Sequence, residues 1–390
     1  MIRVDALYPL FCANIGVGHT CLSLCGAMRG GGLDVRLTVP ASEPTDPRDY
    51  VRNVVPGYLR SLSCRGRFRD MRHWWAERGF LRQLPPDSVT YIWPAVSTSV
   101  YDEIKRRGQV VVMERINCHR ATSRRILDDA YERLGWPASH GITDLDIAEE
   151  TRKLAAADYV FCPSAFVRQS MIEAGVSEDK LLPASYGWEP RRFTGEHRFL
   201  PPVDGMTVLF VGLVCVRKGV HLLLRAWAKA GIKGRLVLAG AIYPEIAEGC
   251  ADELNRPDVL HVKKCPDVAA IYRSADAFAF PTLEEGSPLV SYETLAAGLP
   301  SIVSHMGAGS IIRDGREGIV RDAYDEEAWI HALQQLAADR EYRQWLGANA
   351  RLRAEEFTWE QAGRRRRRQL QQVLTSGQSA LAETGAVLQA

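Results

Sequence analysis

The stretch "TVLFVGLVCVRKGVHLLLRAWAKA", residues 207–230, decides the fold class. A short apolar run ends at Gly212, and a loop with two basic residues leads into a segment whose apolar residues recur at helical spacing. Because the run is apolar on both faces, it predicts a buried strand of a parallel sheet. The stretch therefore predicts a strand–loop–helix unit of an α/β protein.

Ten further short apolar runs alternate with helix-length segments along the chain, and this alternation predicts parallel sheets covered by helices. They are residues 3–11, 34–40, 89–95, 109–115 and 158–164, then 234–240, 258–264, 277–282, 300–305 and 317–320. Residues 188–206 hold three prolines, two glycines and little periodicity, as a linker does.

We therefore expect two Rossmann-like parallel-sheet domains, residues 1–195 and 196–357. Residues 358–390 are expected to form a helix that crosses back to the first domain, followed by a tail. Ligands bind such sheets at the carboxyl ends of their strands, so the predicted site lies in a cleft between the domains.

The composition excludes several function classes. With 46% hydrophobic and 25% charged residues, the 390-residue chain has an ordinary globular composition, and a net charge of +2 argues against a nucleic-acid partner. The nine cysteines show no zinc-ligand spacing, which indicates free thiols. No apolar stretch reaches 18 residues, so we expect a cytoplasmic protein. Such a protein could still bind the inner face of the cell membrane as a peripheral protein.

Two motifs in the first half resemble cofactor or metal sites. Gly16 and Gly18 in "NIGVGHT" follow the first strand, but Cys21 stands where a dinucleotide-binding motif needs a third glycine. A tight turn remains, which is compatible with backbone N–H groups approaching a phosphate or sugar. Asp144 and Asp146 match an acidic metal-binding pair in form, but their place before a helical segment favours helix capping. No metal site or cofactor is expected.

The loop of the opening stretch predicts an anion site. Arg217 and Lys218 lie beside a glycine at the start of a helix, where two cations and the helix dipole suit a diphosphate. A solvated basic turn is the alternative.

A second stretch, "PTLEEGSPLVSYETLAAGLP" at residues 281–300, predicts a loop that runs into a helix. Ser287 fits the N-cap, Pro288 the first helical position and Gly298 the end. A carboxylate beside a diphosphate would be repelled, so Glu285 and Glu293 are expected to accept hydrogen bonds from sugar hydroxyls.

Together these motifs resemble the C-terminal domain of retaining glycosyltransferases of family 4, which have the GT-B fold. The resemblance covers residues 205–360 well, through "FVGLVCVRKGVHLLLRAW", the Glu285 and Glu293 spacing and "AAGLPSIVS". It is weaker in the first half, where "NIGVGHT", residues 113–135 and "AAADYVFCPSAFVRQSMIEAGV" carry it.

The resemblance implies a role for each matching residue. Lys218 and Arg217 would neutralise the donor diphosphate, and Glu293 would hold the ribose. Glu285 would bind the transferred sugar, and His119 would lie near it at the reacting face. The other donor-binding residues implied are Gly16, Gly18, Gly212, Gly286, Ser287, Pro288, Leu289 and Val290.

Two residues depart from the family pattern. Leu213 stands where many relatives have Arg directly after the strand, and Ser287 stands where many have Phe. The phosphate contacts and the identity of the sugar therefore do not follow from the resemblance.

The function implied is metal-independent transfer of a sugar from a nucleotide-sugar, with UDP or GDP, to a hydroxyl of a glycan or lipid-linked acceptor. Synthesis of bacterial surface polysaccharide or glycoconjugate is the expected setting. A non-catalytic sugar- or nucleotide-binding module and a nucleotide-sugar epimerase are the alternatives. Two basic clusters, Arg65–Arg82 with its tryptophans and Arg364–Arg368, could contact an anionic membrane, and a solvated helix face is the alternative for the second.

Overall fold

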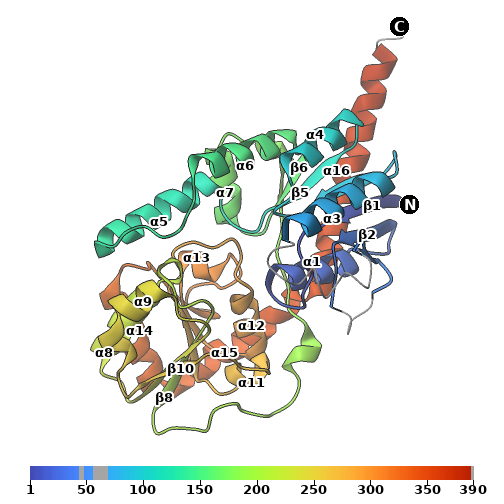
Figure 1. The fold of residues 1–390 in the computed structure, drawn as a ribbon. Coiled ribbons are helices and arrows are strands. Elements are labelled where there is room, and N and C mark those ends of the chain that lie inside the picture. Colours follow the sequence, from blue (N-terminus) through green and yellow to red (C-terminus); the bar gives the residue numbers. More distant parts are fainter. Residues whose placement is uncertain (44–47, 56–68, 388–390) are drawn as a thin grey trace.

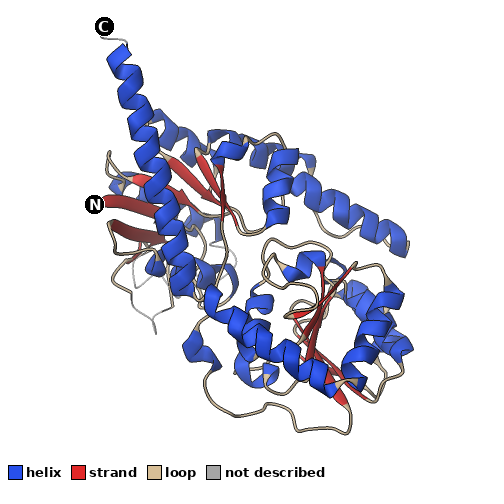
Figure 2. Ribbon diagram, turned by 180° about the vertical axis from the view of Figure 1, so that it is seen from behind, coloured by secondary structure: helices blue, strands red, loops and turns tan. Residues whose placement is uncertain are grey.

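The computed structural model describes residues 1–43, 48–55 and 69–387 and contains two parallel sheets, each covered by helices on both faces (Figures 1 and 2). All eleven apolar runs singled out in the sequence form strands. The predicted α/β fold class, with two Rossmann-like domains, is confirmed.

The N-terminal sheet has seven strands in the order β3-β2-β1-β4-β5-β6-β7. Neighbouring strands pair in parallel throughout, for example Val4 with Val35 and with Val89. The strands are β1 (Ile2–Leu7), β2 (Leu33–Val39), β3 (Val51–Asn53), β4 (Val89–Ile92), β5 (Val111–Glu114), β6 (Tyr159–Cys162) and β7 (Leu181–Pro183).

The C-terminal sheet has six parallel strands in the order β10-β9-β8-β11-β12-β13. The strand of the opening stretch, β8, lies at its centre, next to the point where the strand order reverses. The strands are β8 (Met206–Val211), β9 (Gly234–Ala239), β10 (Val259–Val262), β11 (Ala277–Phe280), β12 (Ser301–Ser304) and β13 (Gly318–Arg321).

Helices fill the connections between strands, and the described residues also form four 3-10 turns. The helices of the first domain are α1 (Gly16–Ala27), α3 (Arg69–Gln83), α4 (Thr98–Arg106), α5 (Arg120–Leu134), α6 (Asp144–Ala156) and α7 (Ala165–Glu173). Those of the second are α8 (Val220–Ala230), α9 (Pro244–Gly249), α10 (Ala251–Leu254), α11 (Val268–Tyr272), α12 (Leu289–Ala297), α13 (His305–Ala308), α14 (Glu326–Ala338) and α15 (Arg340–Ala354). The 3-10 turns are η3 (Glu178–Lys180), η4 (Pro190–Phe193), η5 (Val216–Lys218) and η6 (Glu355–Phe357).

The last helix, α16 (Trp359–Val387), leaves the second domain and packs on α1 and the first sheet (Figure 2). Arg366 on this helix is fully buried and forms a bidentate ion pair with Glu114 at the end of β5. Tyr91 on β4 donates to the same carboxylate at 2.5 Å. Burial alone would lower the pKa of Arg366, but the Glu114 carboxylate outweighs it and raises that pKa.

This contact corrects the expectation of a basic face at Arg364–Arg368. Arg366 lies in the core, and Arg367 is half-buried and donates to the carbonyl of Arg29 at 2.9 Å. Arg364, Arg365 and Arg368 remain exposed. The run therefore serves mainly to attach α16 to the first domain. In any helix that packs on a domain, some of five successive residues face that domain and the others face solvent.

In the other basic cluster, Arg65–Arg82, residues 65–68 lie outside the described residues. The remainder forms α3, on which Trp74 is 52% exposed and Arg78 stacks 5.1 Å from its ring centroid. In the described part of the chain, no helix is both long and apolar enough to cross a membrane.

Candidate active site

The loop after β8 forms the C-terminal wall of the cleft between the domains. Gly219 ends η5 with a φ of +66°, and a Cβ on it would lie 2.0 Å from the carbonyl oxygen of Pro281. Only glycine fits both constraints, so the basic turn is pressed against the end of β11. The sequence singled out Arg217 and Lys218, and the structure places them at this carboxyl edge of the sheet.

Lys218 is buried and forms an ion pair with Glu285. Its ammonium also lies 5.4 Å from the ring centroid of Phe280. Burial, and then the charge of Arg217, lower the pKa of Lys218 to about 7, while Cys215 and the Glu284 carboxylate act in the opposite direction. A buried amine of this kind, beside a cleft, is typical of a functional site.

Arg217 extends into the cleft and meets Glu284, which is 2% exposed. The Arg217 Nη1 donates to the carbonyl oxygen of Glu284 at 3.1 Å and to its Oε2 at 3.4 Å. It also lies 3.8 Å from the carboxylate of Glu285. The two cations and two carboxylates thus alternate along one edge of the cleft.

The loop between β5 and α5 forms the opposite wall. Asn117 Nδ2 donates to both carboxylate oxygens of Glu284, at 3.0 and 2.9 Å, and Ser123 Oγ donates to its Oε1 at 3.0 Å. A Cβ on Gly286 would lie 1.7 Å from the carbonyl oxygen of Ile116. The backbones of the two domains therefore touch here, and the carboxyl ends of the two sheets face each other.

A second bridge crosses the cleft from the far end of α5. Ser139 Oγ donates to Glu245 Oε2 at 2.6 Å, and the backbone N–H of Val216 donates to Glu245 Oε1 at 3.1 Å. Tyr131 Oη lies 2.6 Å from Ser139 Oγ. Trp136 packs so closely on α9 that a Cβ on Gly249 would lie 2.0 Å from its ring.

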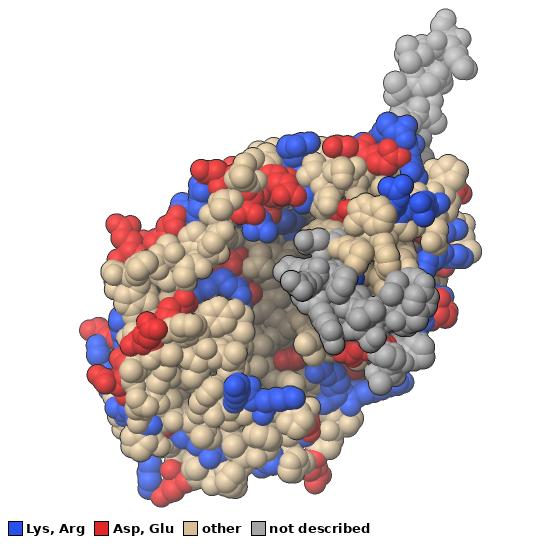
Figure 3. Space-filling view, viewed as in Figure 1, with Lys and Arg blue, Asp and Glu red and all other residues tan. Residues whose placement is uncertain are grey.

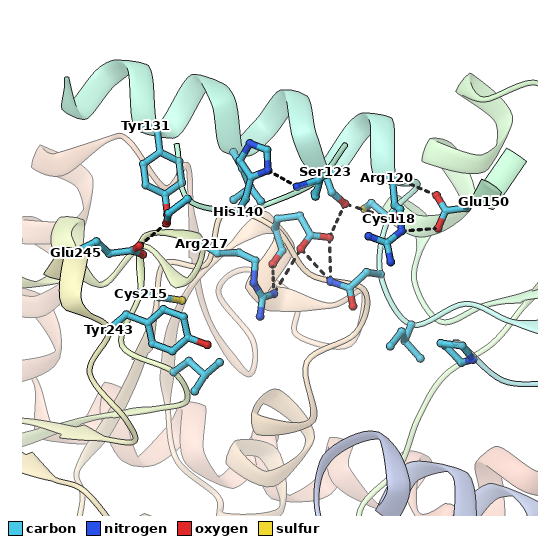
Figure 4. Close-up of a pocket in the computed structure, with 18 of the residues that line it drawn as sticks. Cys118, Arg120, Ser123, Tyr131, His140, Glu150, Cys215, Arg217, Tyr243 and Glu245 are labelled. Atoms are coloured by element: carbon cyan, nitrogen blue, oxygen red, sulfur yellow. Dashed lines mark hydrogen bonds and ion pairs between the residues drawn. The ribbon is translucent and has the colours of Figure 1, made fainter. Parts of the chain in front are cut away.

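Between the two bridges lies a cavity of about 530 Å³ (Figures 3 and 4). In Figure 4, the side chains of Arg217 and Tyr243 both extend into the space below helix α5, which carries Ser123. Leu213 also lines the cavity and is 39% exposed. An apolar side chain therefore occupies the position where the family resemblance leads one to expect a third cation.

His119, which the resemblance places at the reacting face, does not itself line the cavity, although Cys118, Arg120 and Glu150 beside it do. It is 2% exposed and caps α5, its Nδ1 accepting from the backbone N–H of Ala121 at 3.2 Å. Its Nε2 lies 3.5 Å from Glu150, which also pairs with Arg115 at 2.5 Å. Burial lowers the pKa of His119. The capping requirement, which the sequence did not show, fixes this orientation.

The start of α12 differs from the prediction by one residue. Pro288 is the N-cap, and Ser287 instead places its hydroxyl 2.7 Å from Tyr292 Oη. Leu289 and Val290 form the first turn, whose backbone N–H groups have no acceptor within the helix. Gly298 ends the helix with a φ of +67°, as predicted. Proline cannot donate a backbone hydrogen bond, so it suits either of the two positions.

Glu293 is the fifth residue of α12, just over one turn from its start, and accepts from Tyr272 Oη at 3.0 Å. Burial raises its pKa, while Arg192 and the Tyr272 hydroxyl act in the opposite direction. It does not line the cavity described above. Lys218 and Glu285 are thus brought together just before α12 begins, and Glu293 lies further along that helix.

The glycines near the N-terminus serve the turn at the start of α1. Gly16 has a φ of +54°, and a Cβ on Gly18 would lie 2.6 Å from the carbonyl oxygen of Ala13. Neither lines the cavity. At the Asp144 and Asp146 motif, Thr143 rather than an aspartate is the N-cap of α6, and Asp146 completes the capping box. Over the described ranges, no three His, Cys, Asp or Glu side chains are grouped to hold a metal ion.

The sequence did not single out Glu284, Asn117, Ser123 or Glu245. Glu284 stands beside Glu285 in the quoted stretch, so an acidic pair at this point was visible. Its partners lie more than 160 residues away in the chain, and no local pattern connects them. The eight cysteines in the described part of the chain are free thiols, as expected.

Comparisons with known proteins agree with this architecture. Residues 205–339 match the family model "Glycosyl transferases group 1". The D-inositol 3-phosphate glycosyltransferase of Corynebacterium kroppenstedtii is 33% identical over 178 residues, which cover 42% of this chain and 40% of that protein. The chain spans about half or less of the length of the curated relatives it matches.

Two solved structures resemble nearly the whole chain. Sucrose-phosphate synthase from Thermosynechococcus elongatus has a TM-score of 0.72 at 20% identity and covers 96% of this chain and 100% of its own. HepE from Anabaena, in complex with UDP and glucose, has a TM-score of 0.65 at 12% identity with the same coverages. This chain thus has the GT-B fold, and its residues 205–339 match the glycosyl transferases group 1 family.

Proposed function

We propose that this protein is a retaining glycosyltransferase of family 4 that moves a sugar from a nucleotide-sugar to a hydroxyl of a glycan or lipid-linked acceptor. One observation carries the proposal: Lys218, Arg217 and the Glu285–Gly286 turn meet at the carboxyl edge of the C-terminal sheet and face the other domain. This edge belongs to the segment that matches the glycosyl transferases group 1 model.

The donor diphosphate would lie between the basic turn and the start of α12. As the bond between the anomeric carbon and the phosphate oxygen breaks, negative charge grows on the diphosphate, and Lys218 and Arg217 stabilise it. Backbone N–H groups of Leu289 and Val290 add to this field. The same two cations are paired with carboxylates before the donor arrives, so the sugar hydroxyls would replace Lys218 as partners of Glu285.

The acceptor would enter through the cavity between the two bridges. Its hydroxyl oxygen bonds to the anomeric carbon on the face from which the diphosphate leaves, and its proton passes to the departing phosphate oxygen. This sequence retains the configuration of the sugar and needs no protein nucleophile. His119 does not line this cavity, and the proposed step does not use it.

UDP- and GDP-sugars are the proposed donors, and bacterial surface polysaccharide or glycoconjugate synthesis is the proposed setting. The UDP and glucose bound to HepE support a UDP-sugar, since that protein shares the fold. The named activity of the D-inositol 3-phosphate glycosyltransferases supports transfer to a hydroxyl.

The test is incubation of the purified chain with UDP-, GDP- and dTDP-sugars, with and without glycan and lipid-linked acceptors. Mass spectrometry would follow free nucleotide and the sugar product. Nucleotide release that depends on an acceptor supports transfer, conversion of one donor into another indicates an epimerase, and no turnover indicates a binding module. Turnover that survives EDTA supports the proposed independence from metal, and turnover restored only by Mg²⁺ contradicts it.

A further inference from the structure

Glu284 is a carboxylate that lines the cavity and is held by residues of both domains, and it has no role in the proposed mechanism. It is 2% exposed, and it accepts hydrogen bonds from both domains. A buried carboxylate persists only when its lone pairs are filled by good donors. Its donors here are one cation of the proposed phosphate site and two neutral groups of the opposite wall.

We propose that Glu284 is a positioning residue that fixes the Arg217 guanidinium and clasps the β5–α5 wall over the cleft. This rests on the proposed function, since Arg217 is placed there as a partner of the donor diphosphate. Arg217 Nη1 is held twice, by the Glu284 carboxylate and by the Glu284 backbone carbonyl. Two groups of one residue therefore fix the position and the orientation of the guanidinium.

The opposite wall completes the clasp. Asn117 occupies both carboxylate oxygens, and Ser123 shares Oε1 from the first turn of α5. These two donors draw part of the negative charge away from Arg217, which leaves that cation able to attract a diphosphate. Gly286 closes the backbone contact beside them, against Ile116.

A glutamine at this position cannot do the same. An amide has one acceptor oxygen and an NH₂ group, and that NH₂ would face the donors of Asn117 or Arg217. We expect E284Q to lower kcat by roughly tenfold to a hundredfold, the range for hydrogen bonds to a charged group. The donor KM should change less than about threefold, because loss of a negative charge beside the diphosphate offsets the loss of order.

Glu245 provides the matched comparison, because it also bridges the domains but does not contact Arg217. E245Q should weaken the second bridge and act mainly on KM. Glu103, a half-buried partner of Arg106 and Arg107 on α4 that lies outside the cleft, provides the control for a simple loss of charge. E103Q should leave both kinetic constants unchanged.

A double-mutant cycle separates positioning from general loosening. In an R217A background, E284Q should lower kcat by less than about threefold, because the two residues act as a unit. An undiminished effect of E284Q in that background, or the same kcat and KM pattern for E284Q and E245Q, would overturn the positioning role.

Hydrogen exchange of the protein without donor tests the clasp independently of any activity. E284Q and N117A should each speed amide exchange at residues 117–123 and 284–290 by about tenfold, in keeping with a lost hydrogen bond, and E103Q should not. Unchanged exchange in E284Q overturns the clasp. Failure of every donor to react would contradict the proposed function, but the hydrogen-exchange test of the clasp would remain valid.

Discussion

Two basic regions of this chain, the Arg217–Lys218 turn and the Arg364–Arg368 run, look alike in sequence, and each pairs a buried cation with a carboxylate, but they lie in different places. The turn lies at the carboxyl edge of a sheet, where its cations meet carboxylates beside a cavity. The run lies on α16, where Arg366 is buried in the first domain and forms an ion pair with Glu114. Because burial and a carboxylate partner are common to both regions, position beside the cavity, rather than the number of positive charges, distinguishes the proposed binding region from the docking region.

The largest effect should come from Arg366. R366A leaves Glu114 buried without its partner, and breaking such a pair costs about 3–5 kcal/mol of unfolding free energy. Urea unfolding followed by tryptophan fluorescence measures the loss. R364A removes an exposed charge paired with Glu360 and should cost less than about 1 kcal/mol. Equal losses for the two variants would mean that α16 is not held by this ion pair.

The next largest effect should come from Lys218 and should concern activity. K218A is expected to lower kcat/KM for the nucleotide-sugar by roughly a hundredfold or more, as loss of a preorganised charge at a developing anion does. Free nucleotide measured over time provides the readout. K229A, which removes an exposed lysine paired with Glu326, is the control and should stay within about twofold of the parent, as surface pairs do. Near-normal turnover of K218A contradicts the assignment.

The pH dependence of kcat/KM sharpens the same contrast. Lys218 must be protonated to stabilise the diphosphate, and its pKa is lowered to about 7 by burial. The constant kcat/KM, which reports the free enzyme, should therefore fall as pH rises through about 7. The fall in kcat should come at higher pH, because a bound diphosphate favours the charged form of Lys218 and so raises its pKa. A profile that stays flat up to pH 9 would mean that the contact with Glu285 outweighs burial and keeps Lys218 protonated.

The stability of the protein should respond to the same group with the opposite sign. The pKa of Lys218 is lower in the folded than in the unfolded chain, so the unfolded state binds more protons between about pH 7 and the ordinary lysine pKa. The contribution of Lys218 to the free energy of unfolding should therefore rise with pH across this window. Comparing urea midpoints of the parent and K218M at pH 7 and pH 9 isolates it, and a parent that loses stability relative to K218M contradicts it.

The smallest effect should concern membrane contact, which remains a proposal. Because Arg366 and Arg367 are engaged in the fold, R364A/R368A should change sedimentation with anionic liposomes by less than about twofold. The exposed face of α3, with Trp74 and Arg78, is the better candidate, and R72A/R78A should lower binding more at low salt. Binding that is lost only in R364A/R368A would reverse this order.

Much of the fold and part of the candidate site could be predicted from the sequence. Eleven apolar runs, the glycine-bounded basic turn and the end of α12 at Gly298 are local features, and each is fixed by the order of residues within about 20 positions. The runs missed were β3 and β7, three residues each, whose length is too short for a periodic pattern. The order of apolar and polar residues thus determined the α/β class and the position of the basic turn on its sheet.

Only the tertiary structure decided which charges face each other. Glu284 meets Asn117 across 167 positions of sequence, Arg366 meets Glu114 across 252, and His119 turns to Glu150 because it caps a helix. Such pairs depend on how two sheets and a returning helix pack, and packing distances are set by the whole fold rather than by any short segment. The sequence by itself therefore determined the elements and the candidate cations, and the folded chain determined which of them line the cleft and which hold it closed.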